Sequence, residues 1–494
     1  MSTDRKTSAL IPPHASSRRS FFQSVAAGFY GTALAHLHAR EVAAETPRAS
    51  TPHAQTPRDL LSRPPHYAPK AKAVIHLFMN GGPSQMDLFD PKAELAKRHG
   101  ETYFKQIAEE VENPGAAGAL MRSPFTFRRH GQCGNWVSSV LPHLAKHVDD
   151  IAIIKSMHTT NLTHEPAIYK IQSGRMQSTG PSVGAWVVYG LGSINQNLPA
   201  YIVLEDPKGL PINGVENWQS GFLPPIFQGT RFRATGSPVL NLEPAVGHPA
   251  GVVELRRELL GRLDRIHRGR RPGHGELDAR IANYELAARM QLEASDVLDF
   301  RDEQPSTLEL YGVGNKVTDS YGRRCLIARR LVERGVRFVQ IYINHQIWDN
   351  HQQIESGLKH ACGRTDQPIA GLLTDLKQRG LLEDTLVVWG GEFGRLPIAQ
   401  LTGDKSVKTA GRDHNKNAMV TWMAGAGIRG GVSYGTTDEL GFAAQEDRVS
   451  VQDWHATMLH LLGLDHERLV FKRNGLEDKL TSVFDTQLIE GILA

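Results

Sequence analysis

Residues 73–84 read AVIHLFMNGGPS, an apolar run that ends in two glycines and a proline. Continuous apolar runs of this length are typical of strands that are buried on both faces of a parallel sheet. The carboxyl ends of such strands carry the functional loops of open α/β sheets, and Asp87 and Asp90 lie in this first loop. The stretch therefore predicts where an ordered α/β domain begins.

Four later runs have the same apolar character and predict further strands, at residues 151–154, 201–204, 336–343 and 385–389. Between the last two, residues 367–379 have helical spacing and Gly380 ends the helix. A strand, a helix and a second strand in this order favour a right-handed parallel crossover. We expect an α/β fold whose central sheet is parallel in the main.

Residues 251–300 differ from this pattern, because their apolar residues recur at helical spacing. One set of apolar residues precedes a break rich in Gly, Pro and Arg, and it consists of Leu255, Leu259, Leu263 and Ile266. A second set follows the break, and it consists of Leu286, Met290, Ala294 and Val297. This region predicts a helical hairpin inserted between strands.

Composition bounds the class of protein. A chain of 494 residues, 40% of them hydrophobic, is long enough for one large α/β domain. Its formal net charge of +4, from 56 basic and 52 acidic side chains, is too small an excess to indicate a nucleic-acid partner. The three cysteines, Cys133, Cys325 and Cys362, form no CxxC motif, so we expect no disulfide framework.

The N-terminus has the layout of a twin-arginine export signal. Ser17-Arg18-Arg19-Ser20-Phe21-Phe22-Gln23 precedes a mildly apolar run at residues 25–37, which is too short for a stable membrane span. We predict a signal peptide over residues 1–44, a disordered linker over 45–72, and a single domain over 73–494. A basic tail that happens to contain two arginines is the alternative. An exported chain would be periplasmic or extracellular, without a stable membrane span after cleavage.

Acidic and histidine residues follow the later strands. Asp349 and His351 come after residues 336–343, Glu392 and Arg395 follow residues 385–389, and Asp413 and His414 lie further on. Carboxylate oxygen and imidazole nitrogen together suit zinc or another divalent ion. The pattern predicts a metal centre, in which Asp413 orients or bridges while His414 binds.

Each of these motifs also has a purely structural interpretation. Asp349 and His351 would then be a surface pair, and Glu392 and Arg395 a buried ion pair. His455 is a weaker candidate, because the neighbouring Asp453 is suited to capping a helix.

A second functional segment follows residues 151–154. Pro166 favours the first turn of a helix, and Thr163 is a possible N-cap beside His164. Because helix N-termini attract anions, this is a suitable place for a phosphate or sulfate group.

Six motifs together resemble the exported, sulfatase-like family called domain of unknown function 1501, from about Lys72 to Leu464. They are Asn80-Gly81-Gly82-Pro83-Ser84-Gln85-Met86-Asp87, His164-Glu165-Pro166-Ala167 with Ser173-Gly174-Arg175, Trp348-Asp349-Asn350-His351, Gly391-Glu392-Phe393-Gly394-Arg395, Gly411-Arg412-Asp413-His414, and Ala456-Thr457 before Leu461-Leu462-Gly463.

The resemblance implies a distant branch of the alkaline phosphatase and sulfatase superfamily, with a three-layer α/β/α sandwich. Asp349, His351 and His414 then resemble the ligands of one metal, and Glu392 resembles a ligand of another. The pattern departs from the superfamily at Arg395, where a histidine is usual, and at Asn80, where Asp87 would have to replace a metal-binding aspartate. The resemblance implies one or two divalent ions, of zinc, manganese or calcium.

The nucleophile of true sulfatases is missing, because the sequence contains no Cys-x-Pro-x-Arg motif. Three alternatives for the nucleophile stay open. Thr163 could attack as an alkoxide, His164 could form a covalent adduct unless it is a metal ligand, or a metal-bound hydroxide could attack directly, which we favour. Arg395 would then balance charge on the substrate.

The leading hypothesis is thus an exported metal-dependent hydrolase of phosphate or sulfate esters. Its substrate would be a small anionic ester or a sulfated or phosphorylated polymer. The alternative is a catalytically inactive secreted binding or assembly protein that keeps the same fold.

Overall fold

The computed structural model describes residues 59–239, 251–271, 275–401, 403 and 406–494. The predicted signal peptide and the first half of the predicted linker, residues 45–58, lie outside these residues. The described end of the linker is packed: Arg63 N–H donates to Leu191 O at 2.9 Å, and Lys70 N–H donates to Leu461 O at 2.8 Å. Leu60 and Ala71 are buried. Residues 59–72 are therefore part of the domain.

The centre of the domain is an eight-stranded sheet in the order β14-β5-β13-β9-β1-β8-β6-β7. Its strands span Ser433–Tyr434, Ile151–Met157, Met419–Ala424, Thr385–Gly390, Ala73–Phe78, Phe338–Tyr342, Tyr201–Leu204 and Thr230–Phe232, in that order. The pairs β1/β8, β1/β9, β6/β8, β6/β7 and β14/β5 are parallel, whereas β13 is antiparallel to both β5 and β9. The prediction of an α/β fold with a mostly parallel sheet is confirmed.

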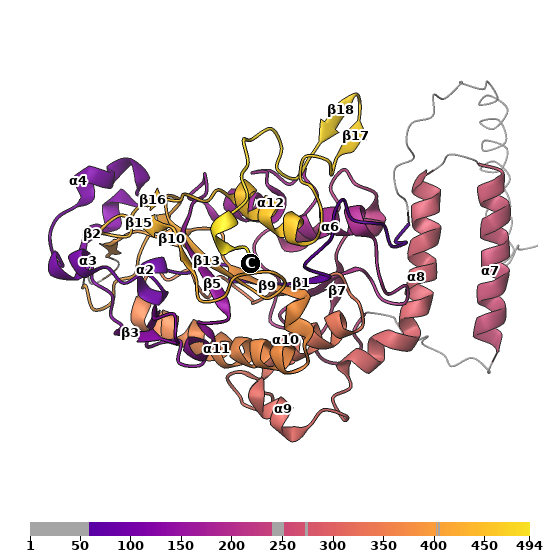
Figure 1. Cartoon of the computed structure of the whole chain (residues 1–494), viewed down its shortest axis with the longest axis horizontal. Coiled ribbons are helices and arrows are strands. Elements are labelled where there is room, and N and C mark those ends of the chain that lie inside the picture. Colours follow the sequence, from indigo (N-terminus) through magenta and orange to yellow (C-terminus); the bar gives the residue numbers. More distant parts are fainter. Residues whose placement is uncertain (1–58, 240–250, 272–274, 402, 404–405) are drawn as a thin grey trace, which may run out of the picture. The chain divides into compact units, whose positions relative to one another are not determined.

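Both faces of the sheet are covered by helices, which explains the continuous apolar strands. Every residue of β1 is buried. The His76 ring lies 5.7 Å from the ring of Trp454, on α12 (Val451–Leu461). Figure 1 shows α12 and α6 (Val183–Leu191) on one side of the sheet, and α10 (Asp319–Glu333) and α11 (Ile354–Gln378) on the other. This is the expected three-layer arrangement.

The inserted hairpin consists of α7 (Val252–Gly269) and α8 (Gly275–Leu298). One apolar face of α8 is buried, including Met290, Ala294 and Val297. Arg289 Nε also donates to Gln196 O at 2.7 Å, which ties α8 to the domain. The predicted hairpin is thus present at the predicted residues.

The other helices and strands are short or join the main layers. They are α2 (Gln85–Leu88), α3 (Ala93–Lys97), α4 (Phe104–Ile107), β2 (Ala117–Leu120), β3 (Phe127–His130), β4 (Asn135–Ser138), α5 (His164–Ser173), α9 (Pro305–Leu310), β10 (Gly394–Arg395), β11 (Ile398–Gln400), β12 (His414–Asn415), β15 (Thr436–Thr437), β16 (Ala444–Glu446), β17 (Phe471–Arg473) and β18 (Leu476–Asp478). Within the described part of the chain, every helix is too short or too polar to cross a bilayer.

Candidate functional site

The topology brings histidine and acidic residues to one edge of the sheet. His164 begins α5 after β5, while Asp349 and His351 lie in the loop between β8 and α11. Parallel strands end at the same edge. His414 precedes the antiparallel strand β13, whose beginning lies at that edge too. Segments that are far apart in the sequence therefore meet here.

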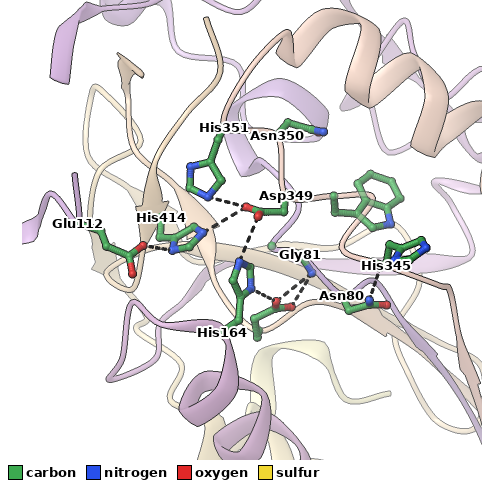
Figure 2. A network of polar contacts seen from close by, with 12 residues as sticks. Asn80, Gly81, Glu112, His164, His345, Asp349, Asn350, His351 and His414 are labelled. Carbon is green, nitrogen blue, oxygen red and sulfur yellow. Dashed lines mark hydrogen bonds and ion pairs between the residues drawn. The ribbon is translucent and has the colours of Figure 1, made fainter. Parts of the chain in front are cut away.

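Three histidines surround the carboxylate of Asp349 (Figure 2). The Nε2 atom of His351 lies 2.9 Å from Asp349 Oδ1, that of His414 lies 3.2 Å from the same oxygen, and that of His164 lies 3.4 Å from Oδ2. One ligand-type atom from each of the four residues lies within 4.8 Å of the others. This spacing fits a single metal ion.

The opposite nitrogen of each imidazole faces an acceptor on the outside of the cluster. His164 Nδ1 lies 2.6 Å from Glu392 Oε1, and His351 Nδ1 lies 2.5 Å from Gln400 Oε1. Glu112 Oε2 lies 2.5 Å from His414 Nδ1. An Nδ1–H that donates outward leaves the Nε2 lone pair directed inward, as in histidines that bind metals.

Glu392 is the most firmly held of these outer acceptors. It is fully buried, and the backbone N–H of Gly81 donates to its Oε1 and Oε2 atoms at 2.9 and 3.1 Å. Gly81 has a φ of +116°, which a residue with a side chain rarely adopts. The glycine-rich turn after β1 thus fixes Glu392, and Glu392 fixes His164.

The Nε2 lone pairs of the three histidines face the negatively charged carboxylate of Asp349. Because lone pairs and a carboxylate repel each other, a metal cation or a proton must lie between them. Burial by itself would lower the pKa of His164, but hydrogen bonds and charges from Asp349 and Glu392 raise that pKa to about 9. Burial would raise the pKa of Asp349, yet the three histidines and Arg395 hold it far below its usual range. Three imidazoles and one carboxylate suit zinc or manganese better than calcium, which prefers oxygen ligands.

Arg395 points into the protein and supports the cluster from behind. It is buried, and it donates to Gly82 O at 2.9 Å, Arg412 O at 3.0 Å and Asp349 Oδ1 at 2.6 Å. A further bond goes to Gly81 O. This guanidinium therefore holds the Asp349 carboxylate and the adjoining turns, whereas we expected it to face a substrate.

Asp87 and His455 lie outside the four-residue group that His164, Asp349, His351 and His414 form. Asp87 is buried in an ion pair with Arg412, whose Nε lies 2.8 Å from Asp87 Oδ2. His455 lies within α12, where Nε2 donates to Ile171 O at 2.8 Å. Asp453 does cap that helix, because it forms a capping box with Ser450.

Asp413 and Thr163 border the group. Asp413 accepts hydrogen bonds from the backbone N–H groups of His414 at 2.9 Å and Asn113 at 3.0 Å. Together with Glu112 and His414 it forms a second possible group of metal ligands, which shares His414 with the first. Thr163 is the N-cap residue of α5 as predicted, and it is exposed.

Two residues of the site, Glu112 and Gln400, were not predicted from the sequence. Glu112 follows a short 3-10 helix at Ala108–Glu110, and Gln400 lies on β11, so neither residue follows a long apolar run. Glu112 precedes Asn113, which contacts Asp413, and this contact brings the segment to the site. Only the tertiary structure identifies such outer partners.

The sequence matches the family model described as Protein of unknown function (DUF1501) over residues 71–493. Comparison with curated protein sequences gave no match.

Similar solved structures include the lipoteichoic acid synthase LtaP from Listeria monocytogenes, with 9% identity, a TM-score of 0.33, and coverage of 86% of this chain and 78% of that chain. The PsFucS1 sulfatase from Pseudoalteromonas sp. has 12% identity, a TM-score of 0.35, and coverage of 84% and 70%. The alkaline phosphatase from the Antarctic bacterium TAB5 has 14% identity, a TM-score of 0.30, and coverage of 73% and 93%. The family model covers most of the chain and includes every residue of the candidate site, so this protein belongs to the family described as Protein of unknown function (DUF1501).

Proposed function

We propose that this protein is an exported, metal-dependent hydrolase of phosphate or sulfate esters. One divalent ion, zinc or manganese, would be held by His164, Asp349, His351 and His414. The observation that supports this proposal is the convergence of three Nε2 atoms on the Asp349 carboxylate while each Nδ1 faces an outer acceptor. Such outer partners fix the orientation of metal-binding histidines and raise their basicity.

The residues of the chain would divide the work between them. His164 is a ligand in this proposal, because Glu392 binds its Nδ1 and Asp349 faces its Nε2. Arg395 positions Asp349. A bound divalent ion would supply positive charge for the ester oxygens and would lower the pKa of a water molecule. Thr163, exposed beside His164, is the one hydroxyl of the chain that we retain as an alternative nucleophile.

A second function is supported by the number of ligands. Four protein ligands complete a tetrahedral shell around zinc, whereas catalytic zinc sites usually keep one position open. A metal in a closed shell would stabilise a secreted binding or assembly protein that does not turn over esters. Both functions include a bound metal, but only the hydrolase would turn over esters.

Metal content and turnover, measured on the same preparations, separate these functions. The purified chain is compared with Asp349→Ala/His351→Ala, and with the control Asp302→Ala/His360→Ala, whose residues are exposed. We expect about one equivalent of zinc or manganese in the chain and in the control, and none in the first variant. Hydrolysis of 4-nitrophenyl phosphate, bis(4-nitrophenyl) phosphate or 4-nitrophenyl sulfate should follow the metal content.

Each alternative result has a definite meaning. Metal without turnover of any of the three esters would favour the binding protein. A chain that takes up no zinc or manganese even when supplemented would contradict the hydrolase and the metal site, and would leave a binding or assembly protein without a metal. If Thr163→Val keeps the metal but loses turnover, the result would support Thr163 as the nucleophile; if turnover remains, Thr163 is excluded and a water molecule is favoured.

Export is proposed from the twin arginines at residues 18 and 19. The experiment is fractionation of cells that express the full chain or its Arg18→Lys/Arg19→Lys variant. Export predicts periplasmic or extracellular protein for the first and cytoplasmic retention for the second. Equal distribution of both would contradict a twin-arginine route.

A further inference from the structure

Helix α7 exposes a row of large apolar side chains. Leu255, Leu259, Leu260, Leu263 and Ile266 each have between 52% and 67% of their surface accessible. Residues 255, 259, 263 and 266 recur at the spacing of one helix face. In a helix that packs against its own domain, this face would be buried.

The opposite face of α7 makes the contact with its neighbour. Arg257, Gly261 and Asp264 are half-buried and recur at helical spacing, and Arg257 Nη2 donates to Ala288 O of α8 at 3.3 Å. Meanwhile α8 buries its own apolar residues against the domain. The hairpin thus presents the apolar face of α7 outward, on a helix that is anchored through α8.

The same helix is strongly basic. Residues 252–271 contain seven arginines and three acidic residues, whereas the whole chain has a formal net charge of only +4. Arg262 lies three residues after Leu259 and four before Ile266, so it borders the apolar row. A basic helix with an exposed apolar face suits the interface of a bilayer with anionic lipids, where its axis lies in the membrane plane.

We propose that α7 docks this protein on anionic phospholipid membranes. The row formed by Leu255, Leu259, Leu263 and Ile266 enters the boundary between headgroups and acyl chains. Arg262 and Arg265 bind lipid phosphates, with their aliphatic stems beside the apolar row. This interaction is peripheral, in keeping with the absence of a spanning helix from the described residues.

Charge favours a membrane over a second copy of the chain. Two α7 helices that met through their apolar rows would bring two sets of arginines together, and like charges that are close in space repel each other. An anionic lipid surface supplies the opposite charge along the full length of the helix. The inference does not depend on the proposed hydrolase activity.

The test is co-sedimentation of the full chain with vesicles of phosphatidylglycerol and phosphatidylcholine, compared with vesicles of phosphatidylcholine alone. Leu255→Gln/Leu259→Gln/Ile266→Gln removes apolar surface without a strong helix breaker. Val317→Gln/Leu476→Gln/Val483→Gln is the matched control, because its residues are exposed apolar side chains elsewhere. Arg262→Gln/Arg265→Gln removes charge alone. Circular dichroism verifies that each variant is folded.

We expect binding to anionic vesicles that weakens with salt, and that falls about tenfold or more in the α7 apolar variant but not in the control. The arginine variant should lose much of the preference for anionic lipid. Absence of binding, equal binding to neutral vesicles, or equal loss in the control would overturn the proposal. A dimer seen by light scattering that dissociates only in the α7 apolar variant, without vesicle binding, would assign the face to a second copy.

Discussion

At the scale of single residues, Arg395 shows how a buried cation serves the site without facing a substrate. Its fork of donors reaches Gly82 O, Arg412 O and Asp349 Oδ1 at once. Lysine carries the same charge on a single nitrogen, which cannot reach the three acceptors that Nε, Nη1 and Nη2 of Arg395 contact. We expect Arg395→Lys to weaken zinc binding about 10- to 100-fold, as loss of an outer partner commonly does.

Competition with a chromophoric zinc chelator measures this affinity. Arg323→Lys is the control, since Arg323 pairs with Asp319 on a half-exposed face of α10. Unchanged affinity in Arg395→Lys would contradict a positioning role for Arg395.

Gly411 is the place where the His414 segment presses against the Asp349 loop. A Cβ at this position would overlap Asn350 O and the backbone of His351 and Gln352. Gly411→Ala must therefore displace the loop, and we expect it to lower the free energy of unfolding by about 2 kcal/mol or more. Zinc binding should weaken as well.

Urea unfolding and zinc titration test both effects in one preparation. Gly363→Ala is the control, because its Cβ would meet open space within α11 and alanine favours a helix. If Gly411→Ala is as stable as the control and binds zinc as tightly, the close approach does not support the site.

The inner residues of the site and the outer acceptor Glu392 could be predicted from the sequence, whereas the outer acceptors Glu112 and Gln400 could not. His164, Asp349 and His351 follow apolar runs, so their place at the sheet edge can be predicted from the order of the strands along the chain, whereas the place of His414 depends on the direction of β13. Glu112 and Gln400 reach the histidines from short irregular segments, whose paths depend on contacts across the whole domain. Asp87 was misleading for the same reason, since its partner Arg412 is far away in the sequence.

At the scale of elements, α12 begins with a cap that can be removed without touching the core. Ser450 Oγ accepts from Asp453 N–H at 3.1 Å, and Asp453 Oδ2 accepts from Ser450 N–H at 2.8 Å. We expect Ser450→Ala to lower the free energy of unfolding by about 1 kcal/mol, because it frees one helix N–H group. Urea unfolding of this variant is compared with Ser356→Ala, an exposed serine of α11. Equal stability of the two variants would contradict the cap's contribution.

The strands could be predicted because their residues form continuous apolar runs, as in strands that are buried on both faces of a sheet. Observed strands β1, β5, β6, β8 and β9 agree with the predicted runs to within a few residues. The direction of β13 was not predictable, because an apolar run at residues 418–423 has the same composition in either direction. That direction is what brings His414 to the edge.

At the scale of the whole molecule, two buried histidines link stability to pH. Burial lowers the pKa of His76 to about 3 and that of His455 to about 4, against about 6.5 in an unfolded chain. Between pH 6.5 and 4 the unfolded chain binds protons that the folded chain does not. Stability therefore falls as the pH falls through this window, by about 1.4 kcal/mol per pH unit for each histidine.

Urea unfolding at pH 7.5, 6 and 5 tests this linkage. The free energy of unfolding should change less with pH in His455→Gln, whose side chain can still donate to Ile171 O. Its dependence on pH should be unchanged in His360→Gln, because His360 is exposed. An identical slope in His455→Gln and the wild type would contradict the assignment to His455.

Removal of the metal should also act on the molecule as a whole. In the proposed site, a ligand that binds only the folded chain stabilises it by about 2.7 kcal/mol at 100 times its Kd. Chelation should lower the melting temperature of the wild type and leave Asp349→Ala/His351→Ala unchanged. Equal shifts in the two proteins would show that the chelator acts elsewhere.

The distance in sequence between residues 164, 349, 351 and 414 also has a consequence in time. During synthesis the chain emerges from its N-terminus, so His414 leaves the ribosome long after His164. The proposed ion-binding set is complete only when β5, β8 and β13 have all joined the sheet, which requires closure of long loops. Uptake of the ion would therefore report that nearly the entire domain has folded, and a nascent or truncated chain would carry none.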